Sequence, residues 1–255
     1  MTSPVFRIIA VRSLQMSLLA LAGHFLWHWP LTGPRAVGWV LTPALCAYFV
    51  FVFVGPWRWG LPILTRLPGA GRAVALTFDD GPSAEVTARI LDVLKEWKAP
   101  ATFFVLGDAV RRRPDLLQRI AGEGHGIGLH GEHHVPMVLP NWGTVRREIA
   151  GARAAVQDAC PEAHCSYLRP PHGFKTLALP WLARQQGLRL CAWSVNARDY
   201  RAATPEQIAA NVLRGVRPGA IILLHDGPGG AATADALPLI LEGLREWGFT
   251  CARLP

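Results

Sequence analysis

From residue 71 onward, short apolar runs alternate with longer stretches of mixed apolar and polar residues. The apolar runs predict strands at 73–78, 101–106, 126–129, 166–169, 188–193, 220–224 and 248–252. The stretches between them predict helices at about 84–98, 114–122, 141–159, 177–186, 205–215 and 234–247. Apolar strands that alternate with helices are typical of a parallel sheet covered by helices. Seven strands in residues 71–255 favour an incomplete (β/α) barrel over an open doubly wound sheet, although periodicity alone does not separate the two.

The pattern before residue 71 differs, because two long apolar segments carry almost no charge. They cover about residues 14–33 and 37–57, and residues 8–57 contain only Arg12 and Arg35 as formal charges. The second segment suits a bilayer span of about 20 residues, and tryptophans cluster near the segment ends. We expect residues 1–70 to be a membrane anchor with one or two transmembrane helices, followed by a single domain at 71–255.

Two other interpretations of the apolar segments stay open. The first segment can be a cleaved signal peptide, although the second segment and the lack of a small-residue cleavage site count against this. The two segments can also form a helix pair that packs on the following domain. If both segments span the membrane, they form a hairpin with a short link between them. The arginines that flank this hairpin outside the link are Arg7, Arg12, Arg58, Arg66 and Arg72. Only Arg35 lies in the link, so the positive-inside rule predicts an inner-membrane protein whose C-terminal domain faces the cytoplasm.

The composition excludes some classes of protein. The chain has 255 residues and a net charge of +8, but its basic residues are scattered and no nucleic-acid-binding motif is present. We therefore expect no nucleic acid partner. The five cysteines contain no Cys-x-x-Cys pair, so nothing indicates a disulfide framework.

The chemistry begins with Asp79 and Asp80, which end the first predicted strand and precede a Gly-Pro turn. A solvated turn is the simplest interpretation of Asp-Asp-Gly in isolation. Adjacent carboxylates repel, however, unless a proton or a cation separates them. One carboxylate can bind a metal ion while the other keeps its lone pairs for proton transfer.

Other polar residues also follow predicted strands, which places them at one end of a parallel barrel. His130 and His134 are four residues apart and can reach one cation together with Asp80. Two histidines and one carboxylate with open positions form a hydrolytic zinc arrangement. Between them, we expect Glu132 to be solvated and His133 to be solvated or to support the ligands.

Two further strand ends carry candidate residues. Arg169 precedes two prolines, His172 and a glycine, a rigid turn that lets a ligand approach closely. His225 ends a buried strand and can act as a general acid, although a single histidine at such a position is more often structural.

Together these motifs resemble the polysaccharide deacetylase family, also called the NodB-homology domain or carbohydrate esterase family 4. The resemblance covers about residues 71–255, and Thr77-Phe78-Asp79-Asp80-Gly81-Pro82 matches the family's most specific signature. It implies a deformed incomplete (β/α) barrel and a divalent metal, usually zinc. The resemblance also implies that Asp80, His130 and His134 bind the metal, that Asp79 is the base and that Arg169 orients it. It implies further that Asp199 partners the acid His225 and that His172, Tyr200 and Leu223 contact substrate.

Three departures lie mostly in the walls of the substrate groove. Gly131 stands where the family usually has Ser or Thr, and His172 stands where an aromatic residue is usual. Asn196 and Tyr200 stand where Asp and Trp are common. Every chemical role is nevertheless filled, so the reaction class is better supported than the family's usual polymer substrates.

The sequence therefore predicts a membrane-anchored, metal-dependent enzyme that removes an acetyl or formyl group from an amino sugar. The substrate is a polysaccharide, an oligosaccharide or a lipid-linked glycan, and the anchor favours the last. An exported enzyme acting on peptidoglycan or exopolysaccharide is an alternative. Two other classes are an inactive metal- or carbohydrate-binding pseudoenzyme and a scaffold for a synthase partner.

Overall fold

The computed structural model describes residues 41–47, 63–137, 142–173, 178–201 and 203–255. The chain divides into two units, Met1–Pro56 and Trp57–Pro255. In the first unit, residues 41–47 are helical. The expected span at 14–33 lies outside the described residues, and the expected span at 37–57 is described only over those seven positions. Within the described ranges, no helix has the length and apolar character needed to cross a bilayer.

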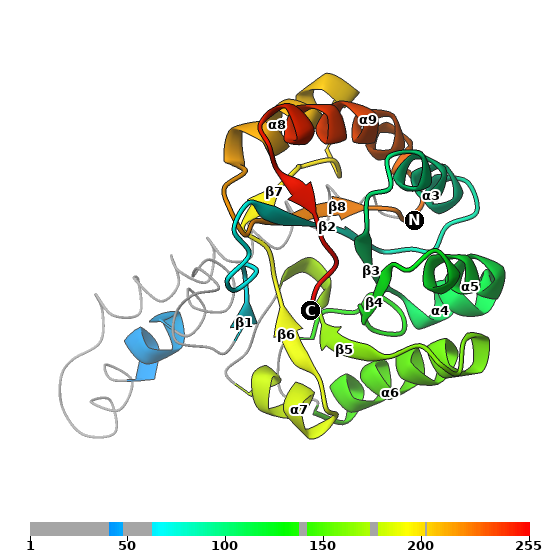
Figure 1. Ribbon diagram of the computed structural model, residues 1–255. Coiled ribbons are helices and arrows are strands. Elements are labelled where there is room, and N and C mark those ends of the chain that lie inside the picture. The colour runs from blue at the N-terminus through cyan, green and yellow to red at the C-terminus, as the bar shows by residue number, and fades with distance from the viewer. Residues whose placement is uncertain (1–40, 48–62, 138–141, 174–177, 202) are drawn as a thin grey trace. The chain divides into compact units, whose positions relative to one another are not determined.

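The second unit is built on one curled parallel sheet (Figure 1). Its strands are β1 (Ile63–Leu64), β2 (Ala73–Asp79), β3 (Ala101–Val105), β4 (Gly126–Leu129), β5 (Cys165–Leu168), β6 (Arg189–Cys191), β7 (Val195–Asn196), β8 (Ile221–His225) and β9 (Thr250–Cys251). They run in the order β1-β6-β5-β4-β3-β2-β8-β7, and β9 pairs with the start of β2. Because β1 and β7 end this order without pairing to each other, the sheet forms the incomplete barrel that was predicted.

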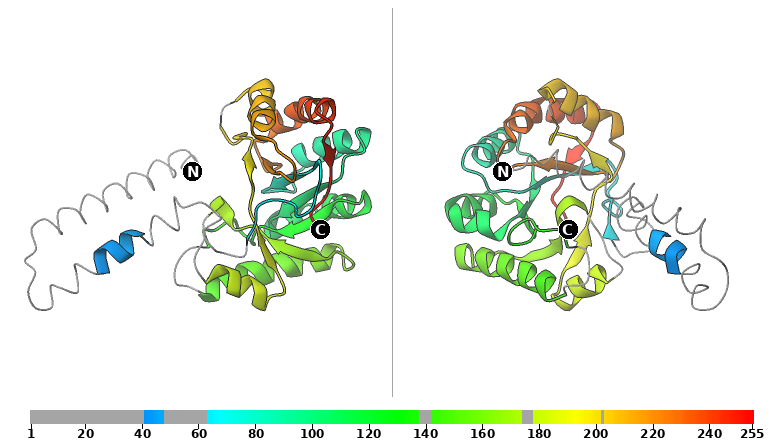
Figure 2. Two further views of the ribbon diagram at one scale, coloured as in Figure 1. Left: turned by 60° about the vertical axis from the view of Figure 1, so that its left-hand side comes forward. Right: turned by 180° about the vertical axis from the view of Figure 1, so that it is seen from behind.

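Helices cover the outer face of this sheet, as Figure 1 and the two turned views in Figure 2 show. They are α3 (Val86–Glu96), α4 (Gly107–Arg112), α5 (Pro114–Gly122), α6 (Trp142–Ala159), α7 (Leu179–Gln185), α8 (Pro205–Gly215) and α9 (Ala231–Glu246), with a 3-10 turn, η1, at Pro171–Gly173. The predicted start of α8 is confirmed. The Thr204 side chain accepts from the Gln207 backbone N–H, and the Gln207 side chain accepts from the Thr204 N–H, so the two form a capping box.

The strands read as continuous apolar runs because they are buried on both faces. On the outer face, Val74, Leu76 and Phe78 of β2 join the large core beneath the helices. On the inner face, Ala75 joins a smaller cluster that fills one end of the barrel. The inner positions that follow Ala75 are Thr77 and Asp79, so this face becomes more polar towards the carboxyl end of the strand.

Each of the seven predicted strands is present, with shifts of at most two residues at its ends. The structure adds β1 and β7, which have only two residues each and show no periodicity of their own. It also adds the six-residue helix α4, whose N-cap residue Leu106 makes no side-chain hydrogen bond to the helix. Short elements of this kind depend on their neighbours rather than on a local sequence signal.

Candidate active site

The predicted site residues gather at the carboxyl end of the sheet. Asp79 is the last residue of β2 and His225 the last of β8, and the parallel register sets these two side by side. His130 directly follows β4, and Arg169 directly follows β5. Alternation of side chains along a strand then directs Asp79 and His225 to the same, inner face. Residues that are 146 positions apart in the chain therefore become neighbours.

Asp80, His130 and His134 form a group that can hold a metal ion. The Nε2 atoms of His130 and His134 lie 3.3 Å and 3.1 Å from Asp80 Oδ1. One ligand atom from each residue falls within 4.8 Å of the other two. Asp80 adopts a left-handed conformation with φ of 76°, which turns its carboxylate away from the line of β2 towards the histidines.

The chemistry of these donors fits a cation. His130 Nδ1 is 2.7 Å from the Arg169 carbonyl oxygen, which can only accept, so Nδ1 carries the proton. In the neutral ring, Nε2 then presents a lone pair to Asp80 Oδ1. That oxygen is buried and has no hydrogen-bond partner among the described residues. Two facing acceptors without a proton require a positive charge between them, and a metal ion supplies one.

The surrounding charges also favour a cation at this position. Burial favours the neutral form of His130, but the negative charges of Asp79 and Asp80 outweigh it and raise the pKa of the ring. Asp79 is neutralised by Arg169, whereas Asp80 pairs only with the two imidazoles among the described residues, so its charge favours a cation there. The geometry and the electrostatics therefore agree on a divalent metal held by Asp80, His130 and His134.

Arg169 fixes the position of Asp79. Its side chain is fully buried, and its Nη1 donates to Asp79 Oδ1 at 2.6 Å and to Thr77 Oγ1 at 2.9 Å. Its Nη2 donates to the Ala192 carbonyl oxygen at 3.0 Å, and the guanidinium lies 4.0 Å above the centre of the Phe104 ring. A guanidinium held at both Nη atoms in this way keeps one carboxylate oxygen of Asp79 in place.

The same arginine links the base candidate to the metal group. Its side chain holds Asp79, while its backbone oxygen accepts from His130 Nδ1. Asp79 Oδ2 lies 3.9 Å from His130 Nε2 and is not held by the arginine. This second oxygen is therefore available to take a proton beside the metal ligands.

Asp199 and His225 form a second pair. Asp199 Oδ1 accepts from His225 Nδ1 at 2.8 Å, and its Oδ2 accepts from the His225 backbone N–H at 2.7 Å. Thr233 Oγ1 of α9 also donates to Oδ2, at 2.8 Å. Burial opposes the charged form of His225, but the hydrogen bond and charge of Asp199 outweigh it and raise the pKa of the ring to about 9. His225 therefore carries a proton at neutral pH.

Comparison with known proteins shows which family shares this sequence. The polysaccharide deacetylase family pattern matches residues 67–214. The chain is 37% identical over 196 residues to the chitooligosaccharide deacetylase of Bradyrhizobium sp. (strain ANU 289), which covers 72% of this chain and 90% of that protein. This chain belongs to the polysaccharide deacetylase family.

Other members of this family are also similar to the chain in sequence or in fold. The peptidoglycan-N-acetylglucosamine deacetylase of Bacillus cereus is 37% identical over 185 residues, covering 71% of this chain and 66% of that protein. The crystal structure of the Bc1960 peptidoglycan N-acetylglucosamine deacetylase has a TM-score of 0.73 at 34% identity, covering 78% and 95% of the two chains. The fold is also shared by BA3943, described as a CE4 family pseudoenzyme from Bacillus anthracis, with a TM-score of 0.69 at 24% identity.

The residues predicted to contact substrate lie near the metal-binding group and the Asp199–His225 pair. The His172 ring packs edge-on against His134 with ring centres 4.4 Å apart, and the half-exposed Tyr200 ring packs edge-on against His225 at 5.6 Å. Leu223 is buried on β8, two residues before His225 and thus on the same face. Tyr200 and His172 therefore flank the two halves of the site.

One prediction in the metal-binding loop is wrong. Glu132 was expected to be solvated, but it is buried and forms an ion pair with Arg111 at the end of α4. His133 is exposed, in accord with the solvated alternative, and its Nδ1 lies 3.1 Å from Glu148 Oε1. Sequence reasoning also missed Thr77, Thr233 and Glu148, because a polar residue inside a strand or helix carries no signal that distinguishes a buried partner from a solvated one.

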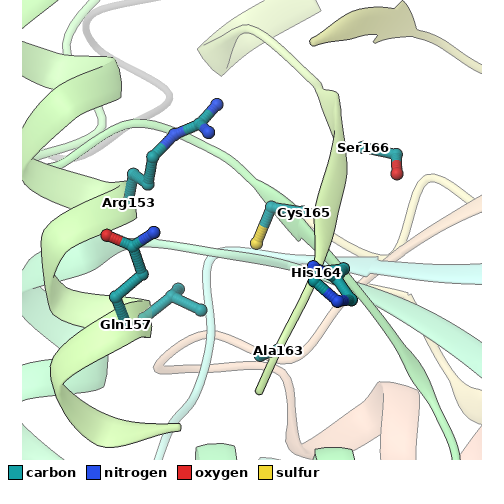
Figure 3. A pocket seen from close by; sticks show the side chains of 7 residues that line it. Arg153, Gln157, Ala163, His164, Cys165 and Ser166 are labelled. Atoms are coloured by element: carbon teal, nitrogen blue, oxygen red, sulfur yellow. The ribbon is translucent and has the colours of Figure 1, made fainter. Parts of the chain in front are cut away.

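A hollow between α6 and the start of β5 is separate from this site. It is lined by Arg153, Gln157, His164 and Cys165, whose side chains Figure 3 shows. These residues lie at the amino end of β5, whereas Arg169 follows its carboxyl end. Burial raises the pKa of the Cys165 thiol to about 11, so this cysteine is not a nucleophile at neutral pH.

Proposed function

We propose that this protein is a metal-dependent hydrolase that removes an N-acyl group from an amino sugar in a glycan. The observation that carries the proposal is the set of three separate groups at one barrel end. These are the metal-binding trio, the Asp79 carboxylate held by Arg169, and the protonated His225 held by Asp199. The related proteins named as chitooligosaccharide and peptidoglycan N-acetylglucosamine deacetylases support the same reaction class.

The chain's own residues divide the proton transfers between them. Asp79 Oδ2, left unheld by Arg169, accepts a proton from the attacking water. His225 Nε2 faces away from Asp199 because Nδ1 is bonded to it, and Nε2 donates a proton to the departing amine nitrogen. A metal ion bound by Asp80, His130 and His134 supplies Lewis-acid polarisation and lowers the pKa of water. We propose Zn²⁺ for this position, because two histidines and one carboxylate match its hydrolytic sites.

The substrate residues are assigned by their places around the site. Leu223 lies on the inner face near His225, where we propose that it contacts the acyl methyl group. Tyr200 and His172 then bind the sugar rings on either side. Since both differ from the residues common in the family, we expect a preference among glycans that differs from that of the named relatives.

The decisive experiment measures acetate and formate release by the full-length protein with added zinc, beside Asp79→Asn. The panel contains chitooligosaccharide, peptidoglycan fragments and a polyprenyl-phosphate-linked N-acyl amino sugar. Release that the variant loses, while it still binds metal, supports the proposal. Full release by Asp79→Asn would remove Asp79 as the base. Metal binding without release from any substrate would favour the pseudoenzyme, a class with the same fold.

We further propose that residues 14–33 and 37–57 anchor the enzyme in the inner membrane, with the catalytic domain facing the cytoplasm. The proposal rests on their apolar composition and on the arginines that flank them. Membrane fractionation tests the anchor, and a reporter fused after Pro255 tests the side. A reporter that is active only when exported would reverse the orientation and favour peptidoglycan or exopolysaccharide as substrate.

A lipid-linked amino sugar is the substrate that this anchor favours. A membrane-bound enzyme meets a lipid-linked substrate within the same surface. We therefore expect the full-length protein to deacylate the polyprenyl-linked glycan faster than the same glycan released from its lipid. Equal rates on both would refute this preference and leave the deacylase activity itself untouched.

A further inference from the structure

The segment Gly131–His133 lies between two metal ligands and determines where the second one points. His134 has φ of 58°, a left-handed conformation that costs a residue other than glycine about 1 kcal/mol or more. Such a conformation persists only where the surroundings fix it. Contacts that hold residues 131–133 therefore bear directly on the position of His134.

Two helices hold this segment from opposite sides. From α4, the backbone N–H of Gly107 donates to the Gly131 oxygen at 3.0 Å, and that of Asp108 donates to the Glu132 oxygen at 3.1 Å. From α6, Glu148 Oε2 accepts from the backbone N–H groups of Glu132 and His133 at 2.8 and 2.9 Å. The backbone of the segment is thus clamped between α4 and α6.

The contact with Glu148 differs from the others because it carries charge. Glu148 is only 6% exposed, and one of its oxygens receives two consecutive backbone N–H groups. Hydrogen bonds to an ionised carboxylate are about twice as strong as neutral ones. A buried carboxylate that makes them fixes both the place and the curvature of the loop.

Gly131 fits this arrangement. Its φ is +94°, and a Cβ at this position would lie 3.3 Å from Glu148 Oε2 and 3.1 Å from Met137 Cε. The Ser or Thr that the family usually carries here is therefore disfavoured by both backbone and space. This chain lacks that side chain next to its first histidine, and a carboxylate from α6 occupies the adjacent space instead.

We propose that Glu148 is a positioning residue of the metal site, which holds His134 in its ligating orientation through the backbone of residues 132 and 133. Nothing in the proposal requires Glu148 to touch the metal or the substrate. It rests on the metal-binding part of the proposed function and not on the identity of the acyl sugar.

The test is a titration of full-length protein with Co²⁺, followed by its visible absorption, and with Zn²⁺ in competition with a chromophoric chelator. Glu148→Ala removes the acceptor of the Glu132 and His133 backbone N–H groups, and we expect it to bind both metals about 10- to 100-fold more weakly than wild type. Glu148→Gln keeps an oxygen that can accept both bonds but lacks the charge, and we expect it to recover part of the affinity.

Two controls separate positioning from stability. Val156→Ala removes a buried side chain from the same helix without touching the loop, so it should lower Tm but bind metal like wild type. His133→Ala removes the ring that contacts Oε1 while keeping both backbone bonds, so its metal affinity should also be close to wild type.

Three results would overturn the proposal: wild-type affinity in Glu148→Ala, an equal loss in Val156→Ala, or no recovery in Glu148→Gln. If Glu148→Ala does not fold, Glu148→Asp replaces it, since its shorter side chain keeps the charge but loses the reach; wild-type affinity there refutes the proposal. Because metal binding is measured without substrate, absence of deacetylation by wild type would count against the proposed function alone.

Discussion

Replacing Asp199 with Asn tests whether His225 is the proton donor. Burial opposes protonation of this ring, yet the hydrogen bond and charge of Asp199 raise its pKa from the ordinary 6.5 to about 9. At about 1.4 kcal/mol for each pH unit, that rise corresponds to about 3 kcal/mol in favour of the imidazolium. Asn keeps the size of Asp and one acceptor oxygen, but it removes the negative charge and weakens the hydrogen bond that together raise this pKa.

The sign of the effect follows from the direction of the shift. A pKa raised in the folded state stabilises that state below pH 6.5, and the contribution is lost as pH rises through about 9. A proton donor acts only while protonated, so wild-type activity should fall above about pH 9. In Asp199→Asn we expect the basic limb to move down by about 1 to 3 pH units, with a much smaller loss of activity on the acidic side.

The assay is kcat/KM for acetate release across the basic range, since this ratio reports the pKa values of the free enzyme. Asp235→Asn is the matched control, because it removes a carboxylate from an exposed pair with Arg89 on the outside of α9. Its profile should match wild type. A uniform fall in Asp199→Asn with an unmoved basic limb would show that Asp199 supports structure only and would refute this role for His225.

Four further predictions concern the metal, the barrel interior and the groove. Removing metal with a chelator should abolish turnover, and Zn²⁺ should restore it; activity that survives metal removal would contradict the proposed chemistry. Arg169→Met leaves the buried Asp79 carboxylate unpaired and should lower unfolding free energy by about 3 to 5 kcal/mol in denaturant titrations. Gly128→Ala places a Cβ 2.6 Å from the Phe104 ring, and we expect a loss of about 1 to 3 kcal/mol by the same measurement. Tyr200→Ala should raise KM more than it lowers kcat, and an unchanged KM would remove this ring from the substrate groove.

Much of the site was predictable because its residues follow strands. Asp79, His130, Arg169 and His225 each end or follow a buried apolar run, and parallel strands bring such positions to one edge. The alternation of strands and helices therefore indicated a parallel sheet, and the positions after its strands indicated which residues meet. The metal trio was predictable for a further reason, since His130 and His134 are four residues apart and follow an acidic pair.

What the sequence did not predict depends on contacts between helices and loops. Glu132 reads as a surface residue, and only the position of α4 shows that it is buried and paired with the exposed Arg111. Glu148 lies in the middle of α6, where a glutamate normally faces water. Its partners are backbone N–H groups sixteen and fifteen residues earlier, and backbone groups leave no trace in a sequence.

The barrel end that the smaller apolar cluster fills is completed late during synthesis of the chain. Leu254 belongs to the apolar cluster that fills this end, and its N–H donates to Thr102 Oγ1, while β9 pairs with the start of β2. The ribosome makes about 5 to 20 residues per second, so residues 250–254 emerge roughly 10 to 35 s after β2. During that interval the cluster at this end lacks Leu254, and the start of β2 lacks its pairing with β9. We therefore expect the nascent chain to expose more apolar surface than the finished domain and to be more prone to aggregation.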